Sequence, residues 1–171
     1  ASKHSVPGAC CWSASWIGTA VGILSNVTIT GTMSAAGSAS IIAFGIHGSF
    51  NPALPFFDAD ASLPTVTEPA DTTGCHLLLT TTNTKDLLFY SCGIKGPLSN
   101  IVTPLGWETI TNTQFADANL LVAARLTGAA QTNLDIDPAV SDSHGNGSIG
   151  DAVNGLGVGG IIPFSPLTGF R

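Results

Sequence analysis

The hydrophobic pattern of the chain consists of short runs rich in Val, Ile, Leu and Thr, which are separated by Gly, Pro, Asn and Asp. No window of about 11 residues or more has apolar residues recurring at spacings of three and four, as an amphipathic helix requires. Short apolar runs with turn residues between them predict β-strands. We expect strands at Cys11–Ile17, Val27–Met33, Ala39–Ile46, Leu77–Thr82, Asp86–Cys92, Trp107–Thr111, Asn119–Leu126, Asn133–Ile136 and Ser148–Val153.

The strand pattern predicts an all-β fold, an antiparallel β-sandwich of jelly-roll-like form. In the first half, alternation over residues 27–30 predicts that Val27 and Ile29 face inward, while Thr28 and Thr30 face outward. The stretch Phe50–Thr73 carries four prolines, which exclude central strands and predict a crossover connection. We therefore expect a sandwich domain over residues 10–154 with a Pro-rich crossover at 50–73, an N-terminal arm at 1–9 and a C-terminal arm at 155–171.

Charged residues make up 9% of the chain, against roughly 25% in soluble domains. A surface with so little charge favours association, and it predicts a protein that is covered by neighbours in an assembly. Five scattered Lys and Arg and a net charge of −6 exclude a basic stripe for nucleic acid. No apolar run approaches the roughly 18 residues of a membrane span. We expect neither nucleic acid nor a membrane as a partner.

Four cysteines are present, at Cys10, Cys11, Cys75 and Cys92. No C-x-x-C pair occurs, which disfavours a zinc ribbon or a thioredoxin-type site. We expect all four to be free thiols that pack as small hydrophobes, in keeping with assembly in a reducing cytoplasm.

Several polar motifs contain residue types that could carry chemistry. Asp142, Ser143 and His144 contain the residue types of a hydrolytic triad, but three sequence neighbours do not make one, and no G-x-S-x-G elbow exists. The pairs Asp58/Asp60 and Asp135/Asp137 are spaced to share a strand face, yet turn residues explain them better than glycosidase carboxylates do. The loop from Asp142 to Gly147 departs from a calcium loop at His144. We expect no catalytic residue, no metal and no cofactor.

The three tryptophans are open to two interpretations, as packing residues or as glycan-stacking residues. Trp12, Trp16 and Trp107 are expected in core or interface packing, as most aromatic side chains are. The alternative is that Trp12 or Trp107 stacks on a glycan.

Three motifs together resemble a known class of modules. The stretch Ser38–Asp60 contains A-F-G-I-H-G followed by P-F-F-D, and Leu63-Pro64 comes next. It is followed by LLTTTNTKDLL at Leu78–Leu88 and by TPLGWETI at Thr103–Ile110. This order is similar to that of the β-sandwich modules of tailed-phage virion proteins.

The resemblance implies a structural jelly-roll-like sandwich with no catalytic residues to carry over. It leads us to expect a capsid decoration or cement protein that binds across capsomer junctions, located in the virion after assembly in the host cytoplasm. The major capsid protein or other virion proteins would be its partners, and a homo-oligomer such as a trimer is implied. The alternative is a tail-fibre or surface adhesin domain that binds carbohydrate.

The C-terminal arm is the candidate assembly element. Its glycines make residues 155–160 flexible in isolation, and Pro163 and Pro166 disfavour a helix. An extended segment with apolar anchors is suited to lying on a neighbouring subunit or to adding a strand to a sheet edge. The expected contact residues are Ile161, Ile162, Phe164, Leu167 and Phe170.

Overall fold

The structure is a computed structural model that describes residues 2–6, 13–17, 28–30, 32, 42, 55–67, 74–95, 100–114, 118–141 and 145–155. Within these ranges the chain forms strands and no helix, and every strand pair is antiparallel. The prediction of an all-β chain with antiparallel pairing is confirmed for this part of the chain.

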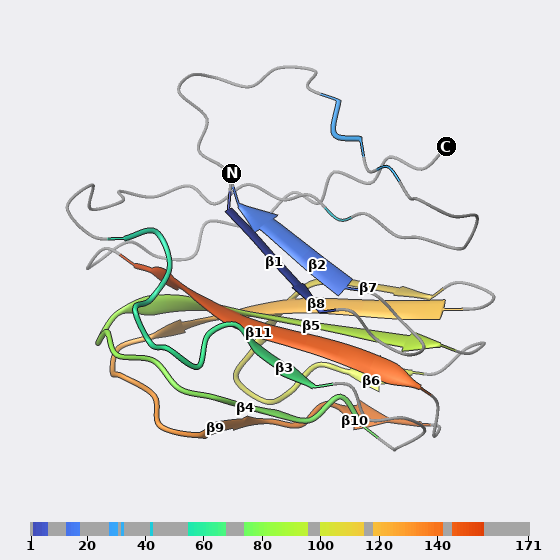
Figure 1. Cartoon of the computed structure of the whole chain (residues 1–171). Coiled ribbons are helices and arrows are strands. Elements are labelled where there is room, and N and C mark those ends of the chain that lie inside the picture. Colours follow the sequence, from blue (N-terminus) through green and yellow to red (C-terminus); the bar gives the residue numbers. More distant parts are fainter. Residues whose placement is uncertain are drawn as a thin grey trace.

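The main element is a five-stranded antiparallel sheet in the order β3-β11-β5-β8-β7 (Figure 1). Its members are β3 (Thr65–Thr67), β5 (Asp86–Lys95), β7 (Glu108–Gln114), β8 (Ala118–Thr127) and β11 (Asn146–Asn154). The strands predicted from Asp86, Trp107, Asn119 and Ser148 onward correspond to β5, β7, β8 and β11. A register shift between Thr109 and Thr111 on β7 makes a bulge against β8.

Three two-stranded ladders accompany this sheet. They pair β1 (Ser2–Val6) with β2 (Ser13–Ile17), β4 (Leu77–Leu79) with β9 (Leu134–Ile136), and β6 (Ile101–Val102) with β10 (Ala139–Val140). In Figure 1 the β4–β9 and β6–β10 ladders lie on one side of the large sheet, while β1 and β2 lie on the opposite side. Strand β1 falls within the segment expected to be an N-terminal arm.

The central strand β5 is buried along most of its length because both of its faces are covered. Tyr90 and Leu88 belong to a core cluster on the side of β4 and β9, whereas Leu87 belongs to a second cluster that includes Ile42. A strand that is covered on both faces has a nearly continuous apolar sequence. In DLLFYSCGIK this run is LLFY, directly after Asp86.

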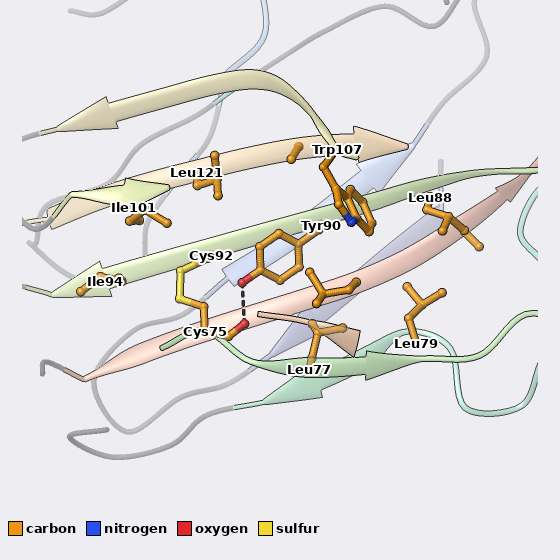
Figure 2. Close-up of a cluster of buried hydrophobic side chains, with 13 residues drawn as sticks. Cys75, Leu77, Leu79, Leu88, Tyr90, Cys92, Ile94, Ile101, Trp107 and Leu121 are labelled. Atoms are coloured by element: carbon orange, nitrogen blue, oxygen red, sulfur yellow. Dashed lines mark hydrogen bonds between the residues drawn. A yellow bond between two sulfur atoms is a disulfide. The ribbon is translucent and has the colours of Figure 1, made fainter. Parts of the chain in front are cut away.

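The larger core fills the space between β5, β8 and β11 on one side and β4 and β9 on the other (Figure 2). Gly150 on β11 is part of this packing, because a Cβ atom there would stand 2.9 Å from Cδ1 of Leu77. The fully buried members of the cluster include Cys75, Leu79, Leu88, Tyr90, Cys92, Leu121, Ala123, Ile136 and Ala152.

One strand prediction in the first half is not supported, and a second falls almost entirely outside the described residues. Thr28, Ile29, Thr30 and Thr32 lie outside any strand, and Ile29 is 59% exposed rather than directed inward. Local alternation gives a strand its two faces, but a ladder also needs a neighbouring strand in register. Of the run predicted at Ala39–Ile46 the structure describes only Ile42, which is also outside a strand.

The Pro-rich connection behaves as its composition predicts where it is described. Residues 55–67 contain one strand, β3, and it lies at the edge of the five-stranded sheet. An edge strand leaves one row of backbone groups outside the ladder, which is the place in a sheet that tolerates nearby proline.

Candidate functional site

A buried pair of carboxyl groups lies where the Pro-rich connection meets the end of the large sheet. Asp58 follows Phe57, which bridges to Val153, and the amide of Asp58 donates to the carbonyl of Ala152 at 3.0 Å. Asp86 is the first residue of β5 and is in register with Asn154, the last residue of β11. The end of β11 therefore brings together two aspartates that are far apart in the sequence.

Asp58 is held as a carboxylate by a ring of donors. Its Oδ1 accepts hydrogen bonds from the Asp60 amide (2.8 Å) and from the hydroxyl (2.9 Å) and amide (3.0 Å) of Thr82. Its Oδ2 accepts from the amide (2.8 Å) and the side-chain Nδ2 (2.6 Å) of Asn83. Burial by itself raises the pKa of Asp58, but the hydrogen bonds from Thr82, Asn83 and Asp60 outweigh it, so the pKa lies below its usual value.

Asp86 has the opposite environment. Its side chain is 1% exposed, and neither carboxyl oxygen has a hydrogen-bond partner among the residues that the structure describes. Burial raises the pKa of Asp86 to about 7, and the nearby Asp58 carboxylate pushes it in the same direction, while the polar side chains of Thr81 and Asn83 oppose part of the shift. The neutral, protonated form of Asp86 is therefore abundant up to near-neutral pH.

Two carboxyl groups whose pKa values are driven apart are the arrangement that acid–base enzymes use. Here, however, Asp58 is 6% exposed, and both of its carboxylate oxygens accept hydrogen bonds from the protein. Asp86 holds a proton, and the hydrogen bonds of Asp58 connect residues 55–60 to the loop before β5. Asp58 and Asp60 belong to a local turn, in which Oδ1 of Asp58 accepts a hydrogen bond from the amide of Asp60.

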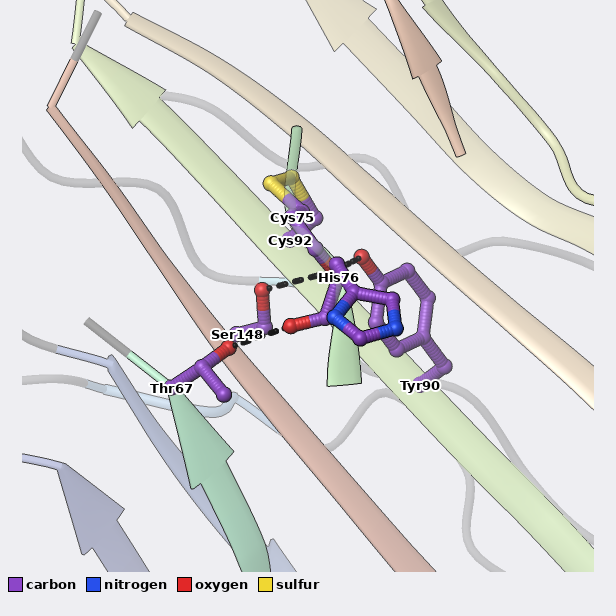
Figure 3. The surroundings of a disulfide bond; sticks show 6 residues. All are labelled: Thr67, Cys75, His76, Tyr90, Cys92 and Ser148. Atoms are coloured by element: carbon purple, nitrogen blue, oxygen red, sulfur yellow. Dashed lines mark hydrogen bonds between the residues drawn. A yellow bond between two sulfur atoms is a disulfide. The ribbon is translucent and has the colours of Figure 1, made fainter. Parts of the chain in front are cut away.

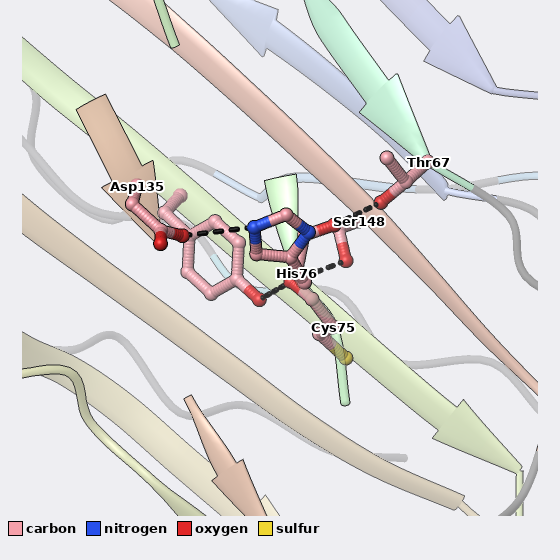
Figure 4. Close-up of polar contacts among 6 residues, drawn as sticks. Thr67, Cys75, His76, Asp135 and Ser148 are labelled. Carbon is pink, nitrogen blue, oxygen red and sulfur yellow. Dashed lines mark hydrogen bonds and ion pairs between the residues drawn. The ribbon is translucent and has the colours of Figure 1, made fainter. Parts of the chain in front are cut away.

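A second polar group surrounds His76, which precedes β4 (Figure 4). Its Nε2 lies 2.9 Å from Oδ1 of Asp135, and both side chains are exposed. The neighbouring hydroxyls do not bond to the imidazole: Thr67 donates to the carbonyl of His76 (2.9 Å) and Ser148 to that of Cys75 (3.2 Å). A hydroxyl nucleophile needs a base that accepts its proton, so this group is not arranged as a catalytic triad.

Cys75 and Cys92 form a disulfide, with Cα atoms 5.8 Å apart (Figure 3). The prediction of free thiols is wrong for these two cysteines, while Cys10 and Cys11 lie outside the described residues. The absence of a C-x-x-C motif concerns only closely spaced cysteines. This bridge spans 17 residues, from Cys75 just before β4 to Cys92 on β5. One available signal was position: Cys92 follows Leu88 and Tyr90 at intervals of two residues and so shares their inward face of β5.

The structure describes only part of the site predicted from the sequence. Trp107 is 8% exposed, and its ring meets Tyr90 edge to face with centroids 6.1 Å apart (Figure 2). It is thus a core residue and offers no open face to a sugar. Trp12, the triad candidates Asp142, Ser143 and His144, and the arm residues Ile161, Ile162, Phe164, Leu167 and Phe170 lie outside the described residues.

Metal ligands do not gather in the ranges that the structure covers, since no three His, Cys, Asp or Glu side chains there could hold one ion. In the same ranges no helix is long and apolar enough to cross a bilayer. Comparisons with protein-family models, with curated protein sequences and with solved structures found no match to this chain.

Proposed function

We propose that this chain is a non-enzymatic structural protein of a virus particle, a capsid decoration or cement protein that binds across capsomer junctions. In this proposal its fold is a jelly-roll-like antiparallel sandwich, with the five-stranded sheet as one layer and the β4–β9 and β6–β10 ladders in the other. The large core cluster between these elements supports such a two-layer arrangement. The major capsid protein and further copies of the chain would be its partners.

One observation carries the proposal, a fully exposed leucine on a tight, hydrogen-bonded turn. Gly106 has a φ of +81°, and the amide of Trp107 donates to the carbonyl of Pro104 at 3.1 Å, so residues 104–107 form a tight turn. Leu105 at its tip is 100% exposed, and Val102 nearby is also exposed, whereas Trp107 is anchored in the core. A leucine presented in this way can insert into a pocket of a partner with little loss of backbone freedom.

Composition supports the same conclusion. With 9% charged residues, the chain has few ionic groups that would oppose close contact with neighbours. In the described part, the hydroxyls of Thr67, Tyr90 and Ser148 and the carboxylate of Asp58 make hydrogen bonds within the protein. A cement protein acts by adding buried area to the assembled state, which mass action then favours. The disulfide fits a location on a particle that meets oxidising surroundings after leaving the cell.

Mass spectrometry of virus particles purified from the source of the gene tests the proposal. The tryptic peptide Asp86–Lys95 should be detected in a constant ratio to the major capsid protein. Its absence from the particles would overturn the proposal. If the recombinant chain instead binds one defined sugar on a glycan array, the adhesin alternative is correct.

Rebinding to particles from which the chain has been stripped tests the role of the turn. The Leu105→Asp variant should bind at least about tenfold more weakly than the wild type, because it loses an apolar anchor and buries a charge. Val66→Asp is the matched control, since Val66 is also exposed and lies on β3, at the opposite edge of the large sheet from β7, which follows the turn. Equal binding by the two variants would show that the turn is not the contact.

A further inference from the structure

The end of the large sheet contains a polar junction that fastens residues 55–60 to β5 and β11. Nδ2 of Asn154 donates to the carbonyls of Pro55 and Phe57, and the Asn154 amide donates to the carbonyl of Phe56 at 3.0 Å. Nδ2 of Asn83 donates both to Oδ2 of Asp58 and to Oδ1 of Asn154. Together with the bridge at Phe57, hydrogen bonds that converge on Asp58 and Asn154 thus hold the segment.

Asp86 lies beneath this junction with two buried oxygens that accept no hydrogen bond within the described ranges. If Asp86 were ionised, a buried negative charge would stand beside the charge of Asp58, and the polar side chains of Thr81 and Asn83 would offset only part of its cost. Two carboxylates repel each other, but a protonated carboxyl is neutral and can donate a hydrogen bond to its neighbour. The protonation state of Asp86 therefore decides whether the junction is under electrostatic strain.

We propose that Asp58 and Asp86 form a proton-operated latch, in which a proton on Asp86 fastens residues 55–60 to the ends of β5 and β11 and its loss loosens them. The moving part, residues 55–60, leads into β3 at the edge of the large sheet. The state of the latch sets how tightly this segment is held against β5 and β11.

Among the charged groups near Asp86, Asp58 is the one that interacts with it directly. The connection contributes Asp58 and Asp60, and the loop before β5 contributes the exposed Lys85. On β11 the partner in register is the neutral Asn154. On β8 it is the neutral Thr127, and Arg125 stands two positions further along, opposite Leu88. Asp151 belongs to the other face of β11, because it alternates with Ala152 and Asn154.

A proton fits the junction better than a metal ion does. The oxygens of Asp58 already accept hydrogen bonds from two backbone amides of the loop before β5, from the amide of Asp60 and from two side chains. A cation shared by both carboxylates would have to displace these donors. A proton on Asp86 requires no such rearrangement.

The direction of the pH effect follows from the two pKa shifts. The pKa of Asp86 is raised from 3.8 in the unfolded chain to about 7, so its contribution to stability is complete below about pH 4 and is lost as the pH rises to 7. Across that interval one proton makes unfolding about tenfold more favourable for each pH unit. The pKa of Asp58 is lowered, so its contribution is present above its unfolded value and is lost in stronger acid.

Urea unfolding between about pH 4.5 and pH 8 tests the latch with three proteins. The wild type should lose stability with a slope approaching one proton, whereas Asp86→Asn, which keeps the shape of the protonated group, should lack this component. Glu108→Gln is the control, because it removes one exposed carboxylate on β7 and should retain the slope of the wild type. Equal slopes for the wild type and Asp86→Asn would overturn the proposal.

Hydrogen exchange shows whether the effect is local. After correction for the intrinsic effect of pH, protection of the Thr82 and Asn83 amides should fall at least about threefold between pH 5 and 8 in the wild type and should stay constant in Asp86→Asn. Uniform loss of protection across β5 and β8 would contradict a latch. Addition of Ca²⁺ or Mg²⁺ at pH 8 should not stabilise the wild type; if it does, the junction is a cation site and the proposal is wrong.

Direct titration keeps the test valid if Asp86→Asn does not fold. Carboxyl carbon NMR of the wild-type protein should give an inflection for Asp86 well above that of a free aspartate. An inflection below pH 5 would overturn the proposal.

Discussion

The hydroxyl of Tyr90 donates a hydrogen bond to the backbone carbonyl of Cys75, so the central strand β5 is tied to the start of β4 by a side chain as well as by the Cys75–Cys92 disulfide. Ser148 on β11 donates to the same carbonyl, and Trp107 packs against the ring of Tyr90 (Figures 2 and 3). The bridge, the tyrosine and the tryptophan thus act as one unit in the core.

Reduction of the Cys75–Cys92 bridge should destabilise the protein by about 3 kcal/mol, because the bond limits the freedom of the unfolded chain over a loop of this length. Urea unfolding with and without a reductant measures the difference. Digestion with trypsin and Asp-N under non-reducing conditions supplies the control, since it should leave residues 71–85 linked to residues 86–95. Separate peptides would show that the bond does not form.

Tyr90 should remain neutral in the folded protein at alkaline pH, because burial raises the pKa of its phenol above the ordinary value near 10. This contribution to stability is complete below about pH 10 and is lost as the pH rises further. Tyr90 is the sole tyrosine of the chain, so the ultraviolet absorbance of tyrosinate reports on it alone. Ionisation should coincide with unfolding seen by circular dichroism, and a reversible titration of the folded protein near pH 10 would refute the expectation.

Gly150→Ala should destabilise the protein by about 1 to 3 kcal/mol, because the added methyl group would approach the packed side chains of Leu77 and Leu79 to within 2.9 and 3.1 Å. Gly128→Ala is the matched control, since a Cβ there meets none of the described residues within 4 Å. Thermal unfolding of both variants measures the effect. Similar melting temperatures would mean that the two leucines can move aside.

Deletion of Gly160–Arg171 should leave the melting temperature nearly unchanged and abolish self-association or attachment to capsids. The reason is that Ile161, Ile162, Phe164, Leu167 and Phe170 lie in a segment too short to form its own core. Sedimentation velocity and a thermal melt, each performed on the full chain and on the truncated chain, separate the two effects. A truncated chain that fails to fold, or that assembles normally, would show that this arm is not an assembly element.

The strands of the second half could be predicted from the sequence, because their signals are local. The runs that became β5, β8 and β11 combine apolar and β-branched residues with Gly, Asn and Asp at their ends, and each approximates a strand in place and length. Proline chemistry likewise indicated that residues 55–67 contain no central strand. The same local signal failed at Ile29, where alternation is present but no ladder is formed.

Contacts between distant residues were decided by the tertiary structure. Pairing of Cys75 with Cys92 requires β4 to pack on β5, and the shift in the pKa of Asp86 requires the connection to bring Asp58 to the start of β5. Trp107 was open to two interpretations until the turn at Gly106 and the ring of Tyr90 placed it in the core. The tendency of a segment to be extended depends on neighbours in the chain. A ladder, a disulfide, a buried charge and a core aromatic depend on which strands meet, and sequence spacing alone does not encode that.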